Sequence, residues 1–323
     1  GHEAAEALLA EGMRDGRLHH AWLITGPPGT GKATLAYRFA RRLFAGVPQG
    51  NSLAVPADDP VFRRVAIGSH ADLLTIEREW DPKKKRLRSE IVVDDVRRVA
   101  GFLHRTAAEG GWRVVVVDGA ETLNANAENA LLKVLEEPPP RAILLLACSA
   151  AGRLRPTIRS RCRRLPLAPV ADAVVAGLLE TYLPQADAAS RARLAVLSEG
   201  SPGRALQLAE GGLGAAELVD QVLGELPRLG VVRAHAVADA LGRDEEAFST
   251  FMELLGAGVA SAVRDAARGR ADPDQLRLLG RRPLDAWAGV WHALAQLQDE
   301  TETAYLDKRQ AIVTGLLMLS QDD

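Results

Sequence analysis

The N-terminal part of the chain places an apolar strand, a glycine-rich loop and a helix in direct succession. Residues 21–24 are apolar, residues 26–34 read GPPGTGKAT, and an apolar stripe predicts a helix from Lys32 to about Ala45. Loops of the form G-x-x-x-x-G-K-[S/T] surround phosphates with backbone N–H groups and place a lysine on the β and γ oxygens. This order predicts a phosphate-binding loop in an α/β domain with a parallel sheet. A glycine-rich turn without a ligand is the simpler alternative.

The loop departs from the pattern at the residue that normally binds Mg²⁺. Ala33 replaces the hydroxyl ligand. Thr34 lies about 100° further round the helix, so it is a poor substitute. Lys32 and the helix N-terminus still favour an anion, which leaves ATP or ADP binding open. The loop residues expected to contact a nucleotide are Gly26, Gly29, Gly31, Lys32 and Thr34.

A second nucleotide motif, an apolar strand that ends in an acid, follows at residues 114–118. Asp118 is placed to reach a metal, directly or through water. In ATPases of this kind the next residue is usually a glutamate that polarises the attacking water, but here it is Gly119. We expect Glu121, in the following turn, to be a solvated or capping carboxylate rather than a base. Two losses point the same way, so we expect very weak or no ATP hydrolysis at this site.

The remaining pattern divides the chain into an α/β part and a helical part. We predict strands at 73–76 and 142–147, a helix capped by Asp94, and a helix over 125–136 that stops at the prolines 138–140. After residue 167 the strand patterns end. The predicted domains are a nucleotide-binding-like domain over 1–165, a small helical lid domain over 166–208 and an all-helical domain over 209–323.

The last predicted helix, over 305–319, carries an apolar stripe. Leu306, Ile312, Leu316 and Leu319 fall near one face of it. The simplest interpretation is the core of a helix bundle, and the alternative is a face that meets partner subunits.

Composition is that of a soluble globular protein, with 47% hydrophobic and 25% charged residues. The formal net charge of −2 argues against a whole-protein electrostatic grip on nucleic acid, although a local basic stripe is compatible with it. The densest basic run, 83–88, is interpreted as a solvated loop, with contact to DNA phosphate or an acidic partner as the alternative. Aromatic residues do not interleave with this run, so base stacking is not expected.

The sequence shows neither a membrane-spanning apolar run nor a signal-peptide pattern, so we expect a cytoplasmic protein without membrane contact. The chain starts at Gly1 without a Met, and we expect that native residues precede it.

Further segments resemble bacterial clamp-loader subunits of the AAA+ superfamily. Residues 129–139 (NALLKVLEEPP) resemble their signature helix, 156–162 (PTIRSRC) their Ser-Arg-Cys segment, and 200–206 (GSPGRAL) their second sensor. His19-His20-Ala21 before the first strand also fits. With the degenerate nucleotide motifs, the resemblance is greatest to delta-prime subunits of the DNA polymerase III clamp loader. It is specific over about residues 1–206, and it implies an AAA+ domain, a helical lid and a helical C-terminal collar.

The resemblance also implies roles for single residues. Arg161 would be an arginine finger offered to ATP that a neighbouring ATPase subunit holds. The alternative is that Arg161 and the arginines around it form a solvated basic face. Ser149 falls near the first sensor position, with Cys148 as the other candidate. Arg204 would be the second sensor, in contact with the γ-phosphate of a bound nucleotide, and a surface salt bridge is its alternative.

No metal site is expected in this chain. Many members of the family carry a four-cysteine zinc module after the first helix, but residues 44–70 contain no cysteine. His70 and Asp72 are lone polar residues that do not make a site. Cys162 is interpreted as a buried packing residue.

Together these features predict a non-catalytic clamp-loader subunit that helps load the sliding clamp onto primed DNA. The implied partners are the gamma/tau ATPase subunits, the delta subunit, the clamp and primer-template DNA. A working gamma/tau-like ATPase motor is the first alternative, and Ala33 and Gly119 count against it. A small-molecule phosphotransferase on a phosphate-loop fold is the second, and it leaves the segments 129–137 and 160–162 unexplained.

Overall fold

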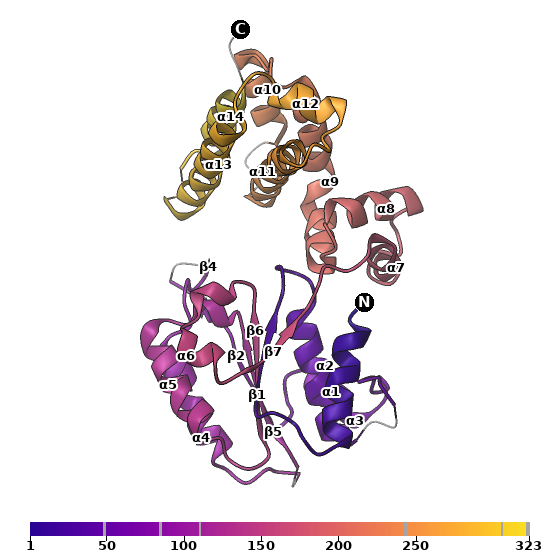
Figure 1. The fold of residues 1–323 in the computed structure, drawn as a ribbon, viewed down its shortest axis with the longest axis vertical. Helices are drawn as coiled ribbons and strands as arrows, with labels where there is room; N and C mark the ends of the chain where they lie inside the picture. Colours follow the sequence, from indigo (N-terminus) through magenta and orange to yellow (C-terminus); the bar gives the residue numbers. More distant parts are fainter. Residues whose placement is uncertain (48–49, 84–85, 110, 242–244, 305, 321–323) are drawn as a thin grey trace. The chain divides into compact units, whose positions relative to one another are not determined.

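The computed structural model describes the chain except residues 48–49, 84–85, 110, 242–244, 305 and 321–323. Two compact units are present, residues 1–204 with an α/β sheet and residues 205–323 with helices (Figure 1). The division between the units falls after Arg204, inside α9 (Pro202–Glu225). The three-domain division with limits at 165 and 208 stays a prediction.

The first unit is built on five parallel strands in the order β2-β5-β6-β1-β7. Their bounds are β1 Ala21–Thr25, β2 Leu73–Ile76, β5 Arg113–Asp118, β6 Ala142–Cys148 and β7 Arg163–Pro166. The predicted strands are confirmed, each within a residue of its expected bounds. Because all five strands run the same way, their carboxyl ends meet at one edge, which is where ligands bind in open α/β sheets.

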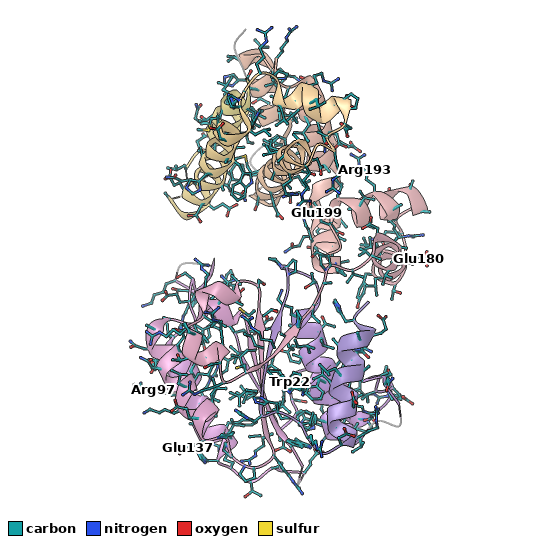
Figure 2. The ribbon with its side chains drawn as sticks, viewed as in Figure 1. Trp22, Arg97, Glu137, Glu180, Arg193 and Glu199 are labelled. Carbon is teal, nitrogen blue, oxygen red and sulfur yellow. The ribbon has the colours of Figure 1, made fainter. Side chains whose placement is uncertain are left out.

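Both faces of the sheet are covered by helices. α1 (Glu3–Arg14) and α2 (Lys32–Ala45) cover one face, and α4 (Val93–Leu103) and α5 (Ala125–Glu136) cover the other (Figure 1). Trp22 of β1 is buried on the α1–α2 side (Figure 2). Successive strand residues therefore alternate between two apolar cores, which explains why the strands read as continuous apolar runs.

The remaining elements of the first unit connect these layers or follow them. They are α3 Pro60–Ala66, β3 Trp80–Asp81, β4 Arg86–Leu87, η1 Ala120–Thr122, η2 Ala151–Arg153, α6 Pro156–Arg159, α7 Asp172–Tyr182 and α8 Ala188–Leu197.

The predicted N-cap of α4 is wrong. Val92 occupies the cap position, one residue before the helix starts, so Asp94 lies inside the first turn. The Asp95 carboxylate accepts a hydrogen bond from the Val92 N–H at 3.0 Å. Asp94 forms an ion pair with Arg97 at 2.6 Å. Two acids, Asp94 and Asp95, lie in the first turn, and it is Asp95 that satisfies the backbone N–H of the cap residue.

The second unit is a bundle of helices. α14 (Lys308–Leu319) packs against α10 (Val231–Leu241) and α13 (Leu284–Ala304), and α11 (Glu245–Ala267) packs against α12 (Pro273–Leu279) and α13. None of the helices in the described part of the chain is long and apolar enough to cross a membrane.

The last helix starts later than predicted. Asp307 caps it by accepting a hydrogen bond from the Gln310 N–H at 2.9 Å. Leu306 therefore precedes the helix and is exposed, while Tyr305 lies outside the described residues. Ile312, Leu316 and Leu319 are buried, so the interpretation of this stripe as bundle core is confirmed.

Helix α5 begins as predicted, because the Asn124 side chain accepts a hydrogen bond from the Ala127 N–H at 3.0 Å. We expect Asn124→Ala to lower the unfolding free energy of the first unit by about 1 kcal/mol, since this cap is lost. Native-state hydrogen exchange of the β5 amides measures this change.

Asn126→Ala is the matched control. Asn126 is exposed two residues further on, inside the helix, where alanine has the higher helix propensity. Its stability should be unchanged or slightly higher, and an equal loss in both variants would contradict the capping role.

Candidate nucleotide site and arginine segment

The phosphate loop, residues 26–34, connects β1 to α2 and has the backbone that its glycines predict. Gly29 and Gly31 have φ values of 71° and 92°, in the left-handed region that favours glycine. α2 starts at Lys32, so its free N–H groups lie in the loop. The predicted loop-to-helix order is therefore present in the structure.

Lys32 is bound to its own loop. Its Nζ donates hydrogen bonds to the carbonyls of Gly26 at 3.0 Å and Pro27 at 2.6 Å, and the residue is only 8% exposed. Burial lowers the pKa of Lys32, and the nearby carboxylates of Glu121 and Asp118 act in the opposite direction. A phosphate at this position would compete with two carbonyls for the ammonium group.

The hydroxyl expected for a metal does not come from the neighbouring threonine. Ala33 is half-buried and carries no polar atom in its side chain, and Thr34 is exposed. The buried hydroxyl of the loop is that of Thr30, which donates to the Pro27 carbonyl at 2.9 Å. The arrangement therefore supplies phosphate donors and leaves the metal position without its usual side chain.

The segment 200–206, where we expect the second sensor, is hydrogen-bonded directly to the phosphate loop. The Gly203 N–H donates to the Gly29 carbonyl at 2.9 Å, and the Ser201 hydroxyl donates to the Pro28 carbonyl at 2.9 Å. The Arg204 N–H donates in turn to the Ser201 hydroxyl at 3.2 Å. The structure thus brings Arg204 beside the loop.

The Arg204 side chain is largely buried, and its Nη1 lies 3.6 Å from a carboxylate oxygen of Glu199. The ion pair that was the alternative interpretation is therefore present. This ion pair lies beside the phosphate loop, so it does not decide between the two interpretations. The role of Arg204 as second sensor stays a prediction.

The acidic part of the site follows β5. Burial, together with the Glu121 carboxylate, raises the pKa of Asp118. Gly119 has a φ of 74° and starts the short helix η1. The residue at the position of the missing glutamate therefore has a backbone that other L-residues adopt only at a cost.

We expect Glu121 to be a solvated or capping carboxylate, but the structure places the residue half-buried. Its Oε2 is buried and has no hydrogen-bond partner among the described residues. The Glu121 carboxylate raises the pKa of Lys32, Asp118 and Cys148, so it belongs to the site. The signal in the sequence was Gly119, because a left-handed glycine turns the chain back over the strand end.

Cys148 and Ser149 end and follow β6 at the same edge. Cys148 is fully buried, and burial raises the pKa of its thiol to about 12, so it is a neutral thiol beside Glu121. Ser149 is partly exposed. Both residues lie at the edge where the first sensor was expected, and the choice between them stays a prediction.

The arginine segment, residues 155–161, includes α6 and packs against α5. Arg161 Nη2 forms an ion pair with Glu136 Oε1 at 2.8 Å, and its Nη1 donates to the Thr157 carbonyl at 3.0 Å. The Arg161 side chain is 36% exposed. It is therefore neither freely solvated nor buried. The neighbouring Cys162 is buried, as predicted, and burial raises the pKa of its thiol to about 12.

His70 and Asp72 have structural partners. The His70 ring stacks on Phe44 with 3.9 Å between ring centroids. Asp72 accepts hydrogen bonds from the N–H groups of Ala108 and Glu109 at 2.8 and 3.2 Å. No group of three or more histidines, cysteines or acids suited to a metal occurs within the described ranges.

The basic run forms part of the hairpin β3–β4. Lys84 and Lys85 lie outside the described residues. The hairpin pairs Leu87 with Trp80, which is 58% exposed. An aromatic side chain thus lies beside the basic run, although residues 83–88 contain none.

These features define the class of the protein. The strand order, the phosphate loop after β1, the acid after β5 and the helical segment bonded to the loop make an AAA+ phosphate-loop fold. The family model described as DNA polymerase III, delta subunit, matches residues 1–171, which is more than half of the chain. The chain belongs to this family.

Individual relatives agree with the delta-prime resemblance. The DNA polymerase III subunit delta' of Pseudomonas aeruginosa is 37% identical over 210 residues, covering 65% of this chain and 61% of that protein. The Escherichia coli K12 subunit delta' is 37% identical over 206 residues, covering 64% and 59%. E. coli subunit tau is 28% identical over 307 residues, covering 92% of this chain and 43% of tau. The chain thus aligns with about 60% of the length of its delta' relatives.

The contact between loop and second-sensor segment gives a prediction. A methyl group on Gly29 would lie 2.2 Å from the Ser201 hydroxyl oxygen and 3.0 Å from the Arg204 nitrogen. We expect Gly29→Ala to break the hydrogen bond from Gly203, so the Gly203 amide should exchange its hydrogen faster. Amide exchange followed by NMR measures this.

Gly68→Ala separates the clash from backbone strain. Gly68 has the same φ of 71°, and no atom lies within 4 Å of its added methyl group. Protection of the Gly203 amide should be retained in this variant. If Gly29→Ala also retained it, the proposed contact would be wrong.

The backbone of Gly119 gives a second prediction. Gly119→Ala should cost about 1–2 kcal/mol of unfolding free energy, because alanine resists the left-handed conformation. An added methyl group meets nothing closer than 3.6 Å, so strain and not crowding would cause the loss. The control is Gly152→Ala, where φ is outside the left-handed region and the space is open. Equal stabilities of the two variants, measured at the β5 amides, would contradict the strain.

Proposed function

We propose that this chain is a clamp-loader subunit of DNA polymerase III that binds nucleotide weakly or not at all and hydrolyses it very weakly or not at all. It offers Arg161 as an arginine finger to ATP in a neighbouring ATPase subunit. One observation carries this proposal. The chain lacks the metal hydroxyl and the catalytic glutamate of its own site, yet its arginine segment is intact and held in place.

The state of the chain's own site supports a non-catalytic role. Ala33 offers no metal ligand, and Gly119 has a backbone that a glutamate would adopt only with strain. Glu121 is a carboxylate in the site, but it lies two residues after the position of the usual base. If ATP or ADP binds, the residues that would hold it are Gly26, Gly29, Gly31, Lys32, Thr34, Asp118, Ser149 and Arg204. The nucleotide would then act as a structural ligand between loop and second sensor.

Arg161 has the chemistry that a finger needs. A guanidinium stays charged, and its planar donors match phosphate oxygens. Such a group stabilises charge that develops on the transferred phosphoryl group, and in other systems this accelerates reaction by about 10³–10⁵. The partly exposed side chain is accessible to a neighbouring subunit without unfolding of α6.

The proposed partners follow from the family. They are the gamma/tau ATPase subunits, the delta subunit, the sliding clamp and primer-template DNA. In this proposal residues 1–165 and 166–208 form the AAA+ and lid domains, and 209–323 form the collar that joins the assembly. The helical second unit, with its buried α14, is compatible with that role.

A gamma/tau-like ATPase motor is the second candidate. The similarity to E. coli tau extends over 92% of this chain, which favours it. Ala33 and Gly119 oppose it. Steady ATP hydrolysis by the isolated chain would show that it is an ATPase motor subunit.

The finger is tested in an assembly of this chain with its ATPase subunits, delta, clamp and primed DNA. In this assembly only the ATPase subunit next to this chain keeps a working phosphate loop. The measured ATP hydrolysis then comes from that single site. Arg161→Ala should lower ATP hydrolysis at that site by about 10³-fold or more, because a transition-state charge loses its partner.

Arg164→Ala is the matched control, since Arg164 is an exposed arginine three residues away. It should leave the rate unchanged. Size-exclusion chromatography checks that both assemblies are complete. An unchanged rate in an intact Arg161→Ala assembly would falsify the finger assignment.

A further inference from the structure

Helix α5 holds the arginine segment at both ends. At the start of the segment, Glu128 Oε1 accepts a hydrogen bond from the Arg155 backbone N–H at 3.1 Å. Glu128 Oε2 forms an ion pair with Arg155 Nε at 3.0 Å. Asn129 accepts from Arg155 Nη1 at 2.7 Å. At its end, Glu136 pairs with Arg161. The two acids come from the first and last turns of the same helix, so α5 sets the position of the whole segment.

The first attachment fixes the backbone. Glu128 is buried, and one of its oxygens receives a backbone N–H while the other receives a guanidinium. Charge-assisted contacts with a buried carboxylate are stronger than those in solvent. The start of α6 is therefore a fixed point, and Arg161 lies only five residues after Pro156, the first residue of α6.

The second attachment fixes the side chain. The two terminal nitrogens of Arg161 have different partners, Nη1 the Thr157 carbonyl and Nη2 the Glu136 carboxylate. A planar guanidinium with both ends engaged cannot turn about its stem without losing one contact. A free arginine side chain has many conformations. Restricting it to the reactive one costs conformational entropy, and part of that cost is already met when the side chain is held.

We propose that Glu136 is a positioning residue for Arg161, and this rests on the proposed function. It orients the guanidinium before the neighbouring nucleotide arrives, so that less conformational freedom is lost in the transition state. Glu136 is 51% exposed, and an ion pair so hydrated is weak. It therefore directs the guanidinium without withholding it from a polyphosphate.

The single-site assembly described above tests this proposal. Glu136→Ala should lower kcat at the reporting site about two- to fivefold, the size expected from one exposed ion pair. KM for ATP should stay unchanged, because the guanidinium acts on the transition state. Glu136→Gln keeps an oxygen that can accept from Nη2, so it should recover part of the rate.

Glu137 supplies the matched control. It is the next glutamate, it is exposed at the outer side of the unit (Figure 2), and the described part of the chain records no ion pair for it. Glu137→Ala should leave kcat unchanged. A general effect of removing negative charge at the end of α5 would instead lower both variants equally, and this would overturn the proposal.

A double-mutant cycle identifies the route of the effect. In an Arg161→Ala background, Glu136→Ala should change kcat no further, because Glu136 acts only through Arg161. An equal loss in both backgrounds, or a higher kcat for Glu136→Ala alone, would overturn the positioning role. If Arg161→Ala itself leaves kcat unchanged, the proposed finger function is wrong. If Arg161→Ala lowers kcat and Glu136→Ala does not, only the positioning role of Glu136 is wrong.

Discussion

The site depends on the parallel direction of its five strands. Because their carboxyl ends share one edge, the phosphate loop, Asp118 and Cys148 meet there although they come from distant parts of the sequence. The apolar cores on both faces maintain this register, since a shift of one residue would exchange the two sets of buried side chains. The chemistry of the chain is thus arranged mainly by apolar packing. The fold therefore does not depend on a hydroxyl side chain at position 33, where this chain has alanine.

Two regions of the first unit use opposite means to hold a charged group. Lys32 is held by backbone carbonyls of its own loop, in a buried position that lowers its pKa. Arg161 is held at the surface by a carboxylate and one carbonyl. Both groups would have to exchange partners to bind phosphate, but the Lys32 ammonium is buried in its own loop, whereas the Arg161 guanidinium is partly exposed to solvent. This difference supports the proposal that Arg161 serves a neighbouring subunit's nucleotide.

Local patterns in the sequence predicted the sheet and most helices, because strands buried on both faces and amphipathic helices leave a strong apolar signal. Predictions failed where the outcome depended on a backbone torsion or a contact distant in sequence. The position of Glu121 follows from the left-handed Gly119, and the cap of α4 follows from Asp95 and not from the first acid. Trp80 reaches the basic run only through strand pairing. The link between Glu136 and Arg161 likewise required the packing of α6 on α5.

The conformation of Gly119 has a consequence for the history of this site. A glutamate at position 119 is a single replacement in sequence, but the backbone there is in the left-handed conformation that favours glycine. The side chain would return to a backbone that no longer accommodates it, while the loop would still lack its hydroxyl. Neither replacement alone would supply both the hydroxyl at position 33 and the carboxylate at position 119.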